Sequence, residues 1–366
     1  CNYLTKLVIP EGVTSIGENA FMHSCLTEIT LSKCLKAIGA HAFKGCTYLK
    51  KIVIPEGVTS IGKEAFRGCI ALAEVTLPSN LKTIESEAFK YCSSLQKLVI
   101  PEGVTSIGKE AFCWSGLTDL TLLCAGLSTF AEAFKLCEHL SKVTLPDGLK
   151  LIDTCAFWVC ESLESIVLPN SIKEIASYAF ANCERLTSIV LPDGLTKLNG
   201  FDSCSSLTEI SIPESVSVIG ESAFGSCTAL KHITMHTAQG QYFANMLRPS
   251  GFNPKADPPI VHIEDRTALT AKYRVYAAIG FALDHRDCTD ENGKKYLKYI
   301  KANAVRLASA AVEYRELFDL MLREQLIAAK DLEAFSAVIQ ASGQDDLIAA
   351  LQAYAEQLPA PKKRKQ

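Results

Sequence analysis

The 366-residue chain lacks a strong charge of either sign, because 37 Lys and Arg residues are set against 40 Asp and Glu, for a formal net charge of −3. Proteins that bind nucleic acid or anionic membranes electrostatically carry a basic excess, so neither partner is expected. No apolar run approaches the roughly 20 residues of a membrane-spanning helix, so no membrane-spanning segment is expected. With 48% hydrophobic and 21% charged residues, the composition is that of a folded globular protein.

The chain also lacks the short motifs that accompany catalysis. It has no Gly-x-Ser-x-Gly elbow, no His-Glu-x-x-His pair and no phosphate-binding Gly-Lys-Ser/Thr sequence. Its seven histidines are scattered, and His232 and His236, four residues apart on a predicted strand, would lie about 13 Å from each other at 3.3 Å per residue. We therefore expect no enzyme, no cofactor and no metal site.

The sequence contains a repeat instead. An Ala-Phe pair, a Cys three residues later, a Leu three further on and an alternating apolar triplet recur along the chain. A repeat this short cannot bury its own apolar face and must stack on its neighbours. The pattern predicts a solenoid over residues 1–236 whose core contains the repeat phenylalanines, which follow one another at intervals of 21 to 23 residues: Phe21, Phe43, Phe66, Phe89, Phe112, Phe134, Phe157, Phe180, Phe201 and Phe224.

Eight of the 15 cysteines occupy one position of the repeat, three residues after the phenylalanine: Cys46, Cys69, Cys92, Cys137, Cys160, Cys183, Cys204 and Cys227. A buried thiol can fill a small core position as a hydrophobe. Ser24 and Ser115 take the same position in two repeats and cannot form a cross-link. A column of unpaired thiols is the favoured interpretation. Disulfides or a metal remain alternatives, although the chain has no Cys-x-x-Cys pair.

Each repeat carries an alternating apolar triplet, which is typical of a short strand. Because every repeat runs in the same direction, the sheet should be parallel, with strands about 4.8 Å apart. Eleven such strands are expected, centred on Leu7, Ile29, Ile52, Val75, Leu98, Leu120, Val143, Ile166, Ile189, Ile210 and Ile233.

The residue before each central apolar position should face outward. From Lys6 to Lys142 seven successive residues of this column alternate in charge, which predicts a self-neutralising ladder on the open face of the sheet. Ser165 and Ser188 end the alternation, so this part of the face is a candidate partner-binding patch. Trp114 and Trp158, on the turn after the repeat phenylalanine, are the other candidates, with packing as the alternative role for each.

Residues 61–78 read Ile-Gly-Lys-Glu-Ala-Phe-Arg-Gly-Cys-Ile-Ala-Leu-Ala-Glu-Val-Thr-Leu-Pro. They resemble the unit of the BspA-type leucine-rich repeat proteins, Ile-Gly-x-x-Ala-Phe-x-x-Cys-x-x-Leu-x-x-Ile-x-[Ile/Leu]-Pro. The resemblance implies a right-handed leucine-rich-repeat solenoid of about 10 to 11 repeats with short parallel strands. Members of this family are mostly bacterial and often at the cell surface or secreted, and several are associated with adhesion to host or matrix proteins.

The two ends of the repeat region carry further expectations. Residues 1–10 superimpose on residues 46–55, so the chain starts within a repeat and we expect its natural N-terminus upstream. Residues 237–262 break the period and contain four prolines, which predicts a capping segment and a Pro-rich linker. Residues 263–358 show helical periodicity, which predicts a small all-α domain of five helices, one of them over 290–312, loosely resembling ankyrin-type helix pairs. The basic tail at 359–366 should be disordered, with a nuclear-import signal as the alternative.

Two functions fit these observations. The first is a non-enzymatic scaffold that binds a protein partner, adhesin-like, at the cell surface or secreted. The alternative is an intracellular, cytoplasmic adaptor in which the helical domain binds the partner and the repeats act as a spacer. The unpaired thiols favour a reducing environment, whereas the family resemblance favours the cell surface.

Overall fold

The structure, a computed structural model, describes residues 4–247 and 258–358, which form two compact units. The solenoid unit comprises described residues 4–231 and 242–247, and the helical unit comprises 232–241 and 258–358. The start of the first repeat at 1–3, the proline-containing segment 248–257 and the basic tail 359–366 lie outside the described residues.

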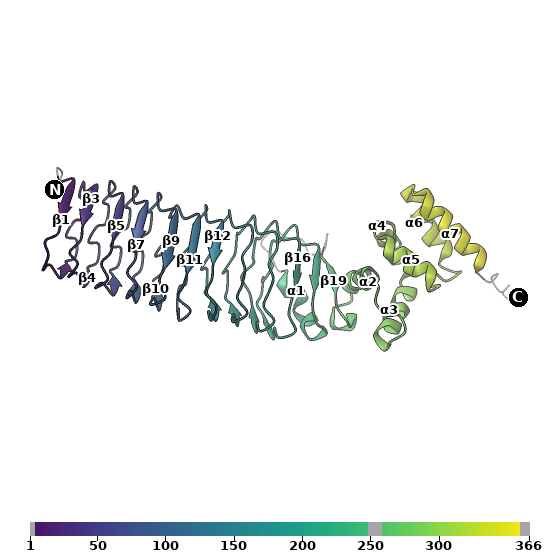
Figure 1. The fold of residues 1–366 in the computed structure, drawn as a ribbon. Coiled ribbons are helices and arrows are strands. Elements are labelled where there is room, and N and C mark those ends of the chain that lie inside the picture. Colours follow the sequence, from purple (N-terminus) through teal and green to yellow (C-terminus); the bar gives the residue numbers. More distant parts are fainter. Residues whose placement is uncertain (1–3, 248–257, 359–366) are drawn as a thin grey trace, which may run out of the picture. The chain divides into compact units, whose positions relative to one another are not determined.

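The solenoid unit is built from stacked repeats, most of which contribute strands to two parallel rows (Figure 1). The long-strand row contains β1 (Lys6–Val8), β3 (Glu28–Thr30), β5 (Lys51–Val53), β7 (Glu74–Thr76), β9 (Lys97–Ile100), β11 (Asp119–Leu122), β12 (Lys142–Thr144) and β16 (Glu209–Ser211). The short-strand row contains β2 (Ser15–Ile16), β4 (Ala37–Ile38), β6 (Ser60–Ile61), β8 (Thr83–Ile84), β10 (Ser106–Ile107), β13 (Leu151–Ile152), β14 (Glu174–Ile175), β15 (Lys197–Leu198) and β17 (Val218–Ile219).

Strand pairs are parallel and keep equivalent positions of successive repeats in register, as Leu98 and Leu120 show in β9 and β11. Each position of the repeat therefore forms a column along the solenoid. The parallel solenoid predicted from the sequence is confirmed. The short-strand row was not predicted, because two-residue strands carry too little alternation to be recognised from the sequence.

The prediction of strands centred on Ile166 and Ile189 is wrong, because residues 164–169 and 187–191 have no strand conformation. The repeats are more widely spaced here. The rings of Phe134, Phe157 and Phe180 follow one another at 5.7 and 5.6 Å, compared with 5.1 Å between Phe43 and Phe66. The ring spacing does not by itself account for the lost strands, because Phe201 and Phe224 are also 5.6 Å apart and β16 lies between them.

The solenoid core contains the stacked phenylalanine column. From Phe21 to Phe224 successive rings lie 5.1 to 5.7 Å apart and within 16° of parallel. All members except Phe21 are buried. Beside this column each repeat cysteine donates a hydrogen bond from Sγ to the carbonyl oxygen of the phenylalanine in the preceding repeat, at 3.0 to 3.5 Å. The thiols thus serve as hydrogen-bond donors as well as small hydrophobes.

The last repeat of the solenoid unit is followed by a short helix, α1 (Phe243–Met246). The carbonyl oxygens of Asn245 and Met246 accept hydrogen bonds from the backbone N–H groups of Ser222 and Phe224, both at 2.9 Å. Phe243 and Met246 are buried. The helix therefore supplies hydrogen-bond acceptors to the backbone N–H groups of the last repeat, which a following repeat would otherwise provide.

The helical unit begins with two parallel strands, β18 (His232–Thr234) and β19 (Ile260–His262), and two short 3-10 segments, η1 (Thr237–Tyr242), whose last residue belongs to the solenoid unit, and η2 (Arg266–Ala268). Its α-helices are α2 (Arg274–Leu283), α3 (Glu291–Ala302), α4 (Ala304–Glu313), α5 (Arg315–Arg323), α6 (Leu332–Ser342) and α7 (Asp345–Gln357). None of the helices in the described residues is both long and apolar enough to cross a membrane.

The interpretation of residues 290–312 as one helix is wrong. Asn303, at φ −125° and ψ 21°, separates α3 from α4, and its side-chain amide donates a hydrogen bond to the carbonyl oxygen of Tyr299 at 2.9 Å. An Asn side chain competes with the helical backbone for hydrogen bonds. The apolar periodicity continues through this position, which is why the sequence pattern did not reveal the interruption.

Candidate interaction surfaces

The long-strand row exposes the charged column predicted from the sequence. Ion pairs join Lys6 to Glu28 at 2.9 Å and Lys51 to Glu74 at 2.5 Å. Lys142 also lies 3.7 Å from Asp119. These pairs confirm the self-neutralising ladder. Because most of these side chains are well exposed to solvent, each pair contributes only a few tenths of a kcal/mol. This part of the strand face has little charge left for a partner.

The strand face changes where the long-strand row is interrupted. Ser165 and Ser188 are exposed on successive repeats, and Val167 and Val190, which follow them by two residues, are each 83% exposed. Two shallow hollows of about 420 and 260 Å³ adjoin at Ile166 and Val167. We call the surface formed by Ser165, Val167, Ser188 and Val190 the strand-face patch. It combines exposed apolar side chains with backbone that is not held in a strand.

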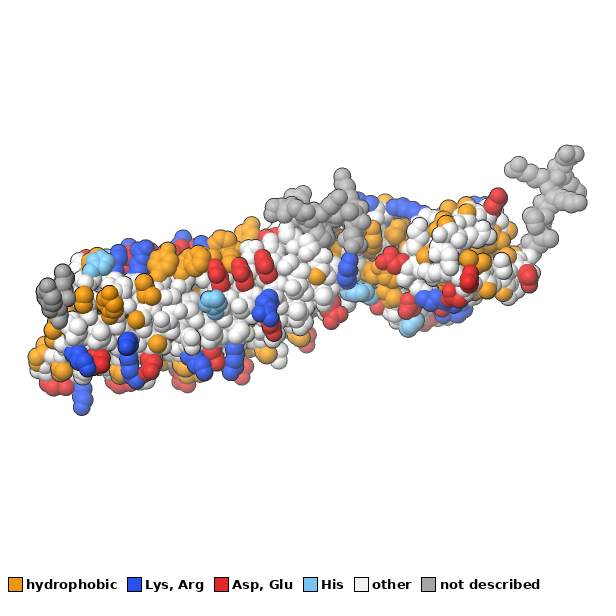
Figure 2. Space-filling model, turned by 90° about the horizontal axis from the view of Figure 1, so that it is seen from above, with side chains coloured by type: hydrophobic (Ala, Val, Ile, Leu, Met, Phe, Trp, Pro, Cys, Tyr) orange, Lys and Arg blue, Asp and Glu red, His pale blue; other side chains and the backbone are white. Residues whose placement is uncertain are grey.

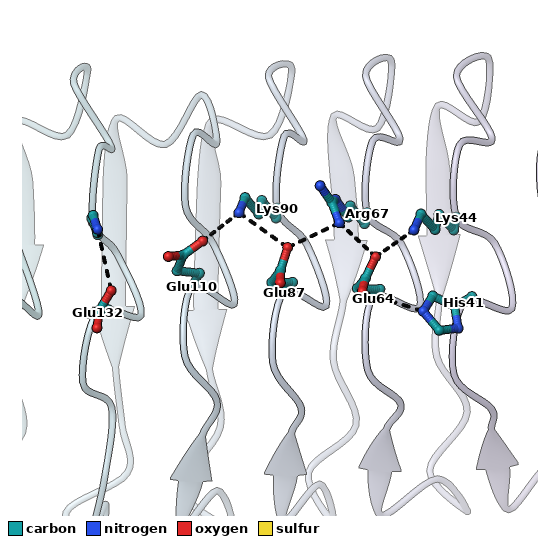
Figure 3. Close-up of polar contacts among 9 residues, drawn as sticks. His41, Lys44, Glu64, Arg67, Glu87, Lys90, Glu110 and Glu132 are labelled. Carbon is teal, nitrogen blue, oxygen red and sulfur yellow. Dashed lines mark hydrogen bonds and ion pairs between the residues drawn. The ribbon is translucent and has the colours of Figure 1, made fainter.

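A second charged ladder, which the sequence analysis missed, lies on the turns that lead to the repeat phenylalanines (Figure 3). Glu64 pairs with Lys44 at 2.7 Å and with Arg67 at 2.8 Å. Glu87 continues the ladder, with Arg67 at 3.3 Å and Lys90 at 3.2 Å. These residues are separated by three or about 20 positions in the sequence. The pairs between residues about 20 positions apart form only because the repeats stack in register.

Glu64 is the most buried member of this turn ladder, with a side chain only 9% exposed. Burial by itself would raise the pKa of Glu64, but the hydrogen bonds and charges of Lys44 and Arg67 outweigh it and lower the pKa to about 2. The carboxylate is therefore ionised at any physiological pH. Glu64 thus contributes a fixed negative charge to the turn ladder.

Four successive repeats carry a bulky side chain in left-handed backbone conformation, two residues after the repeat phenylalanine. Tyr91, Trp114, Leu136 and Val159 have φ values of 58° to 63°, a region in which a non-glycine residue costs about 1 to 2 kcal/mol. Gly45 and Gly68 occupy this column in earlier repeats at φ 71°, so Gly45 shows that the position accepts glycine. We call the four bulky residues the turn ridge.

The turn ridge gains little burial in return for this strain. Tyr91 is 41% exposed and Trp114 is 43% exposed, whereas Leu136 and Val159 are half-buried. Trp158, the other tryptophan candidate, belongs to the neighbouring column, where the ammonium group of Lys135 lies 4.4 Å from its ring centroid. The structure thus places Trp158 in an intramolecular contact and leaves Trp114 available at the surface.

An acidic row lies beside the turn ridge. Glu138, Glu161 and Glu184 occupy the same position of three successive repeats, four residues after the phenylalanine, and among the described residues none of their carboxylates forms an ion pair. Figure 2 shows this face, where a row of acidic side chains runs along a band of hydrophobic ones. Three like charges on adjacent repeats repel one another, in contrast to the two paired ladders.

In the helical unit the structure brings together residues that the sequence analysis treated as scattered. The Nδ1 atom of His232 lies 2.8 Å from Nε2 of His262, whose own Nδ1 lies 2.7 Å from Oδ1 of Asp284. Arg286 pairs with Asp284 at 2.9 Å and also donates a hydrogen bond to the carbonyl oxygen of Ile263. This network joins β18 and β19 to the end of α2. Sequence separations of 22 and 30 residues left no pattern that could have revealed it.

A hollow of about 720 Å³ lies in the helical unit, where α3 ends and α4 begins. Its lining contains four basic side chains and a single acidic one, Asp331. Within the described residues none of the four basic groups forms an ion pair: Lys298, Lys301, Arg306 and Lys330. The same part of the chain contains no group of three His, Cys, Asp or Glu side chains arranged to hold a metal ion.

Comparison with known families decides what kind of protein carries these surfaces. The family described as the BspA type leucine rich repeat region matches in six copies, over residues 1–125 and 128–246. The chain belongs to the BspA-type leucine-rich repeat family. Its BspA-type repeats therefore account for the solenoid unit, including the phenylalanine and cysteine columns, while most of the helical unit lies beyond the matched residues.

One of the similar solved structures, the first below, shows the same fold. A leucine-rich repeat protein from Bacteroides ovatus is 26% identical with a TM-score of 0.51, and the alignment covers 73% of this chain and 70% of that one. A leucine rich cell surface protein from Faecalibacterium prausnitzii is 25% identical over 69% and 89% of the two chains, with a TM-score of 0.35. The pneumococcal vaccine antigen PcpA is 20% identical over 73% and 71%, with a TM-score of 0.46. The comparison with curated proteins finds no match.

Proposed function

We propose that this BspA-type protein is a non-enzymatic scaffold that binds a protein partner through the strand-face patch. The observation that carries the proposal is the pair of valines, Val167 and Val190, each 83% exposed where the strand row is interrupted. Exposed apolar side chains next to one another are the usual mark of a binding surface. Val53 and Val99 on the intact strand row are less exposed, at 51% and 54%, so the patch carries the most exposed valines among the described residues of this face.

The family supports a bacterial surface location. BspA-type repeats are found in surface-attached and secreted proteins, several of them associated with adhesion, so we propose an adhesin-like role toward a host or matrix protein. The column of buried thiols is compatible with this location, because burial raises the pKa of Cys92 to about 12 and leaves its sulfur protonated and unreactive.

The test is a binding experiment with the whole chain and matched variants. Val167→Lys with Val190→Lys places charges on the strand-face patch, and Val53→Lys with Val99→Lys does the same on exposed valines of the intact strand row. Extracellular matrix and host surface proteins, purified singly, are immobilised and probed with each variant. The proposal is supported by an immobilised protein that binds the wild type and the Val53/Val99 variant but does not bind the Val167/Val190 variant. Equal loss in both variants, or binding by neither wild type nor variants, contradicts it.

A second candidate function rests on the basic hollow between α3 and α4. The hollow of about 720 Å³ is lined by four basic side chains that have no ion-pair partner among the described residues. This charge favours an acidic segment of a partner protein as the occupant. In that case the helical unit binds the partner and the repeats act as a spacer, as in an intracellular adaptor. Lys298→Glu with Lys301→Glu should then abolish partner binding that the strand-face variant leaves intact. Retained binding in the lysine variant would rule this candidate out.

A further inference from the structure

The turn ridge lies on a different part of each repeat from the strand-face patch and carries its own evidence of binding. Tyr91, Trp114, Leu136 and Val159 all occupy left-handed backbone at φ near 60°. Gly45 shows that glycine, which is unstrained in this region, is tolerated at the position. The same conformation recurs in the turns of other repeats, at His23, Asn182 and Ser203, and the Tyr91 ring also contacts the cations of Arg67 and Lys90. What distinguishes the ridge is that its side chains are bulky and partly exposed. Tyr and Trp are also the residue types enriched where binding energy is concentrated.

The spacing of the ridge matches one element of secondary structure. The repeats that carry it follow one another at 5.3, 5.3 and 5.7 Å, measured between the ring centroids of Phe89, Phe112, Phe134 and Phe157. An α-helix advances about 5.4 Å per turn. A helix lying along the solenoid axis therefore places one side chain of its apolar stripe against each ridge residue in turn. An extended strand, with side chains of one face about 6.8 Å apart, loses this register within two repeats.

The charge beside the ridge determines the chemistry of that helix. Glu138 and Glu161 belong to the repeats of Leu136 and Val159, and Glu184 continues the acidic row by one repeat. None of these carboxylates has an ion-pair partner within the described residues. Like charges on adjacent repeats repel, and lysines or arginines along one flank of a docked helix relieve this repulsion.

We propose that the turn ridge and the acidic row together bind an amphipathic α-helix of a partner protein, with its apolar stripe on the ridge and a Lys- or Arg-rich flank on the glutamates. The inference rests on the proposed function in assigning protein binding to the solenoid, but it names a separate surface and a definite class of partner. The turn ridge supplies the apolar and aromatic anchors. The acidic row determines which side of the helix carries the basic residues and makes the binding depend on salt concentration.

The experiment uses the full chain and a synthetic peptide of about 18 residues, or five helical turns. The peptide contains only Leu and Lys, with Leu recurring every third or fourth position on one side. A second peptide has the same composition in scrambled order. Each is labelled with a fluorophore, and binding is followed by anisotropy. The ridge variant replaces all four residues by glycine: Tyr91→Gly, Trp114→Gly, Leu136→Gly and Val159→Gly.

A matched control replaces His23 and Ser203 by glycine, because they occupy the same column at φ 54° and 61° outside the ridge. The wild type should bind the amphipathic peptide and not the scrambled one. The ridge variant should weaken binding by at least about tenfold, and the control should keep it. The ridge variant should also melt no lower than the wild type, since glycine relieves the left-handed strain. Glu138→Gln, Glu161→Gln and Glu184→Gln together should weaken binding and reduce its salt dependence.

Several results would overturn the inference. Equal binding of the scrambled peptide would show that charge alone attracts it, and full binding by the ridge variant would show that it docks elsewhere. A lower melting temperature for the ridge variant would make the ridge a packing element. A wild-type dimer that the ridge variant dissociates would make a second copy of the chain the occupant. The Val167/Val190 variant separates the two proposals, because it should lose the protein partner of the strand face and still bind the peptide.

Discussion

The thiol of Cys92 donates a hydrogen bond to the carbonyl oxygen of Phe66, one repeat earlier, at 3.3 Å. The same bond recurs at each repeat cysteine, and serine takes this position in two repeats. A hydroxyl group can donate a hydrogen bond as a thiol does. The Ser24 hydroxyl lies 3.1 Å from Sγ of Cys46, and that of Ser115 lies 3.3 Å from Sγ of Cys137. The column therefore combines small volume with a donor, which disulfide formation would remove.

Replacement of Cys92 should separate these two roles. Cys92→Ser keeps a donor of similar size, whereas Cys92→Ala opens a small cavity and removes one of the two hydrogen bonds that the Phe66 carbonyl accepts, the other coming from the backbone N–H of Cys69 at 3.2 Å. We expect the alanine variant to be less stable than the serine variant by about 1 kcal/mol. Urea unfolding monitored by circular dichroism provides the comparison. If the serine variant were as unstable as the alanine variant, side-chain volume and polarity would explain the preference for cysteine at this position, and hydrogen bonding would not.

Stability should depend on pH through Glu64. The pKa of Glu64 is about 2 in the folded protein, below the value of about 4.3 expected for an unfolded chain. The contribution of Glu64 to the free energy of unfolding is therefore fully present above pH 4.5 and is lost as the pH falls toward 2. Glu64→Gln should therefore destabilise the protein at pH 7 by roughly 2 to 3 kcal/mol. The difference from wild type should narrow between pH 4.5 and 3 in urea unfolding. Glu102→Gln, on an exposed turn, serves as the control and should show no such narrowing.

The exposed ladder on the strand face should respond to salt. Glu74→Lys removes the pair with Lys51 and places a third like charge between Lys51 and Lys97. We expect a loss of less than about 1 kcal/mol at low ionic strength, which 1 M salt largely abolishes because it screens exposed charges. Glu74→Gln removes the ion pair without adding repulsion, so its stability should lie between those of the wild type and Glu74→Lys. A salt-independent loss would mean that Glu74 acts through packing instead of charge.

The phenylalanine column should be the most sensitive part of the solenoid. Phe112 is fully buried, with the rings of Phe89 and Phe134 each 5.3 Å away. Phe112→Ala leaves a cavity that the stacked neighbours cannot fill and should cost about 3 to 5 kcal/mol, whereas Phe112→Leu should cost less. Thermal unfolding monitored by circular dichroism measures both. Equal melting temperatures for wild type and Phe112→Ala would contradict a continuous stacked core.

Most of the solenoid was predictable from the sequence because its information is local and repeated. The Phe-to-Phe interval identified the stack, and the alternation of Lys and Glu before each strand centre identified the strand-face ladder. The candidate surfaces were only partly predictable. Ser165 and Ser188 were identified by a change in charge pattern, yet the loss of strand conformation beside them was not, because the apolar alternation continues through Ile166 and Ile189.

The amino-acid order alone determined the period, the parallel stacking and the residues that fill the core, because the same pattern of apolar side chains recurs in every repeat. Only the tertiary structure decided which side chains of different repeats meet. Glu64 contacts Lys44 and Glu87 contacts Arg67 across repeats, and in the helical unit His262 contacts Asp284, through distances set by the stacking and folding of the backbone. The left-handed conformation at Trp114 was likewise invisible in the sequence, because it is imposed by the turn that all repeats share and not by the residue that occupies it.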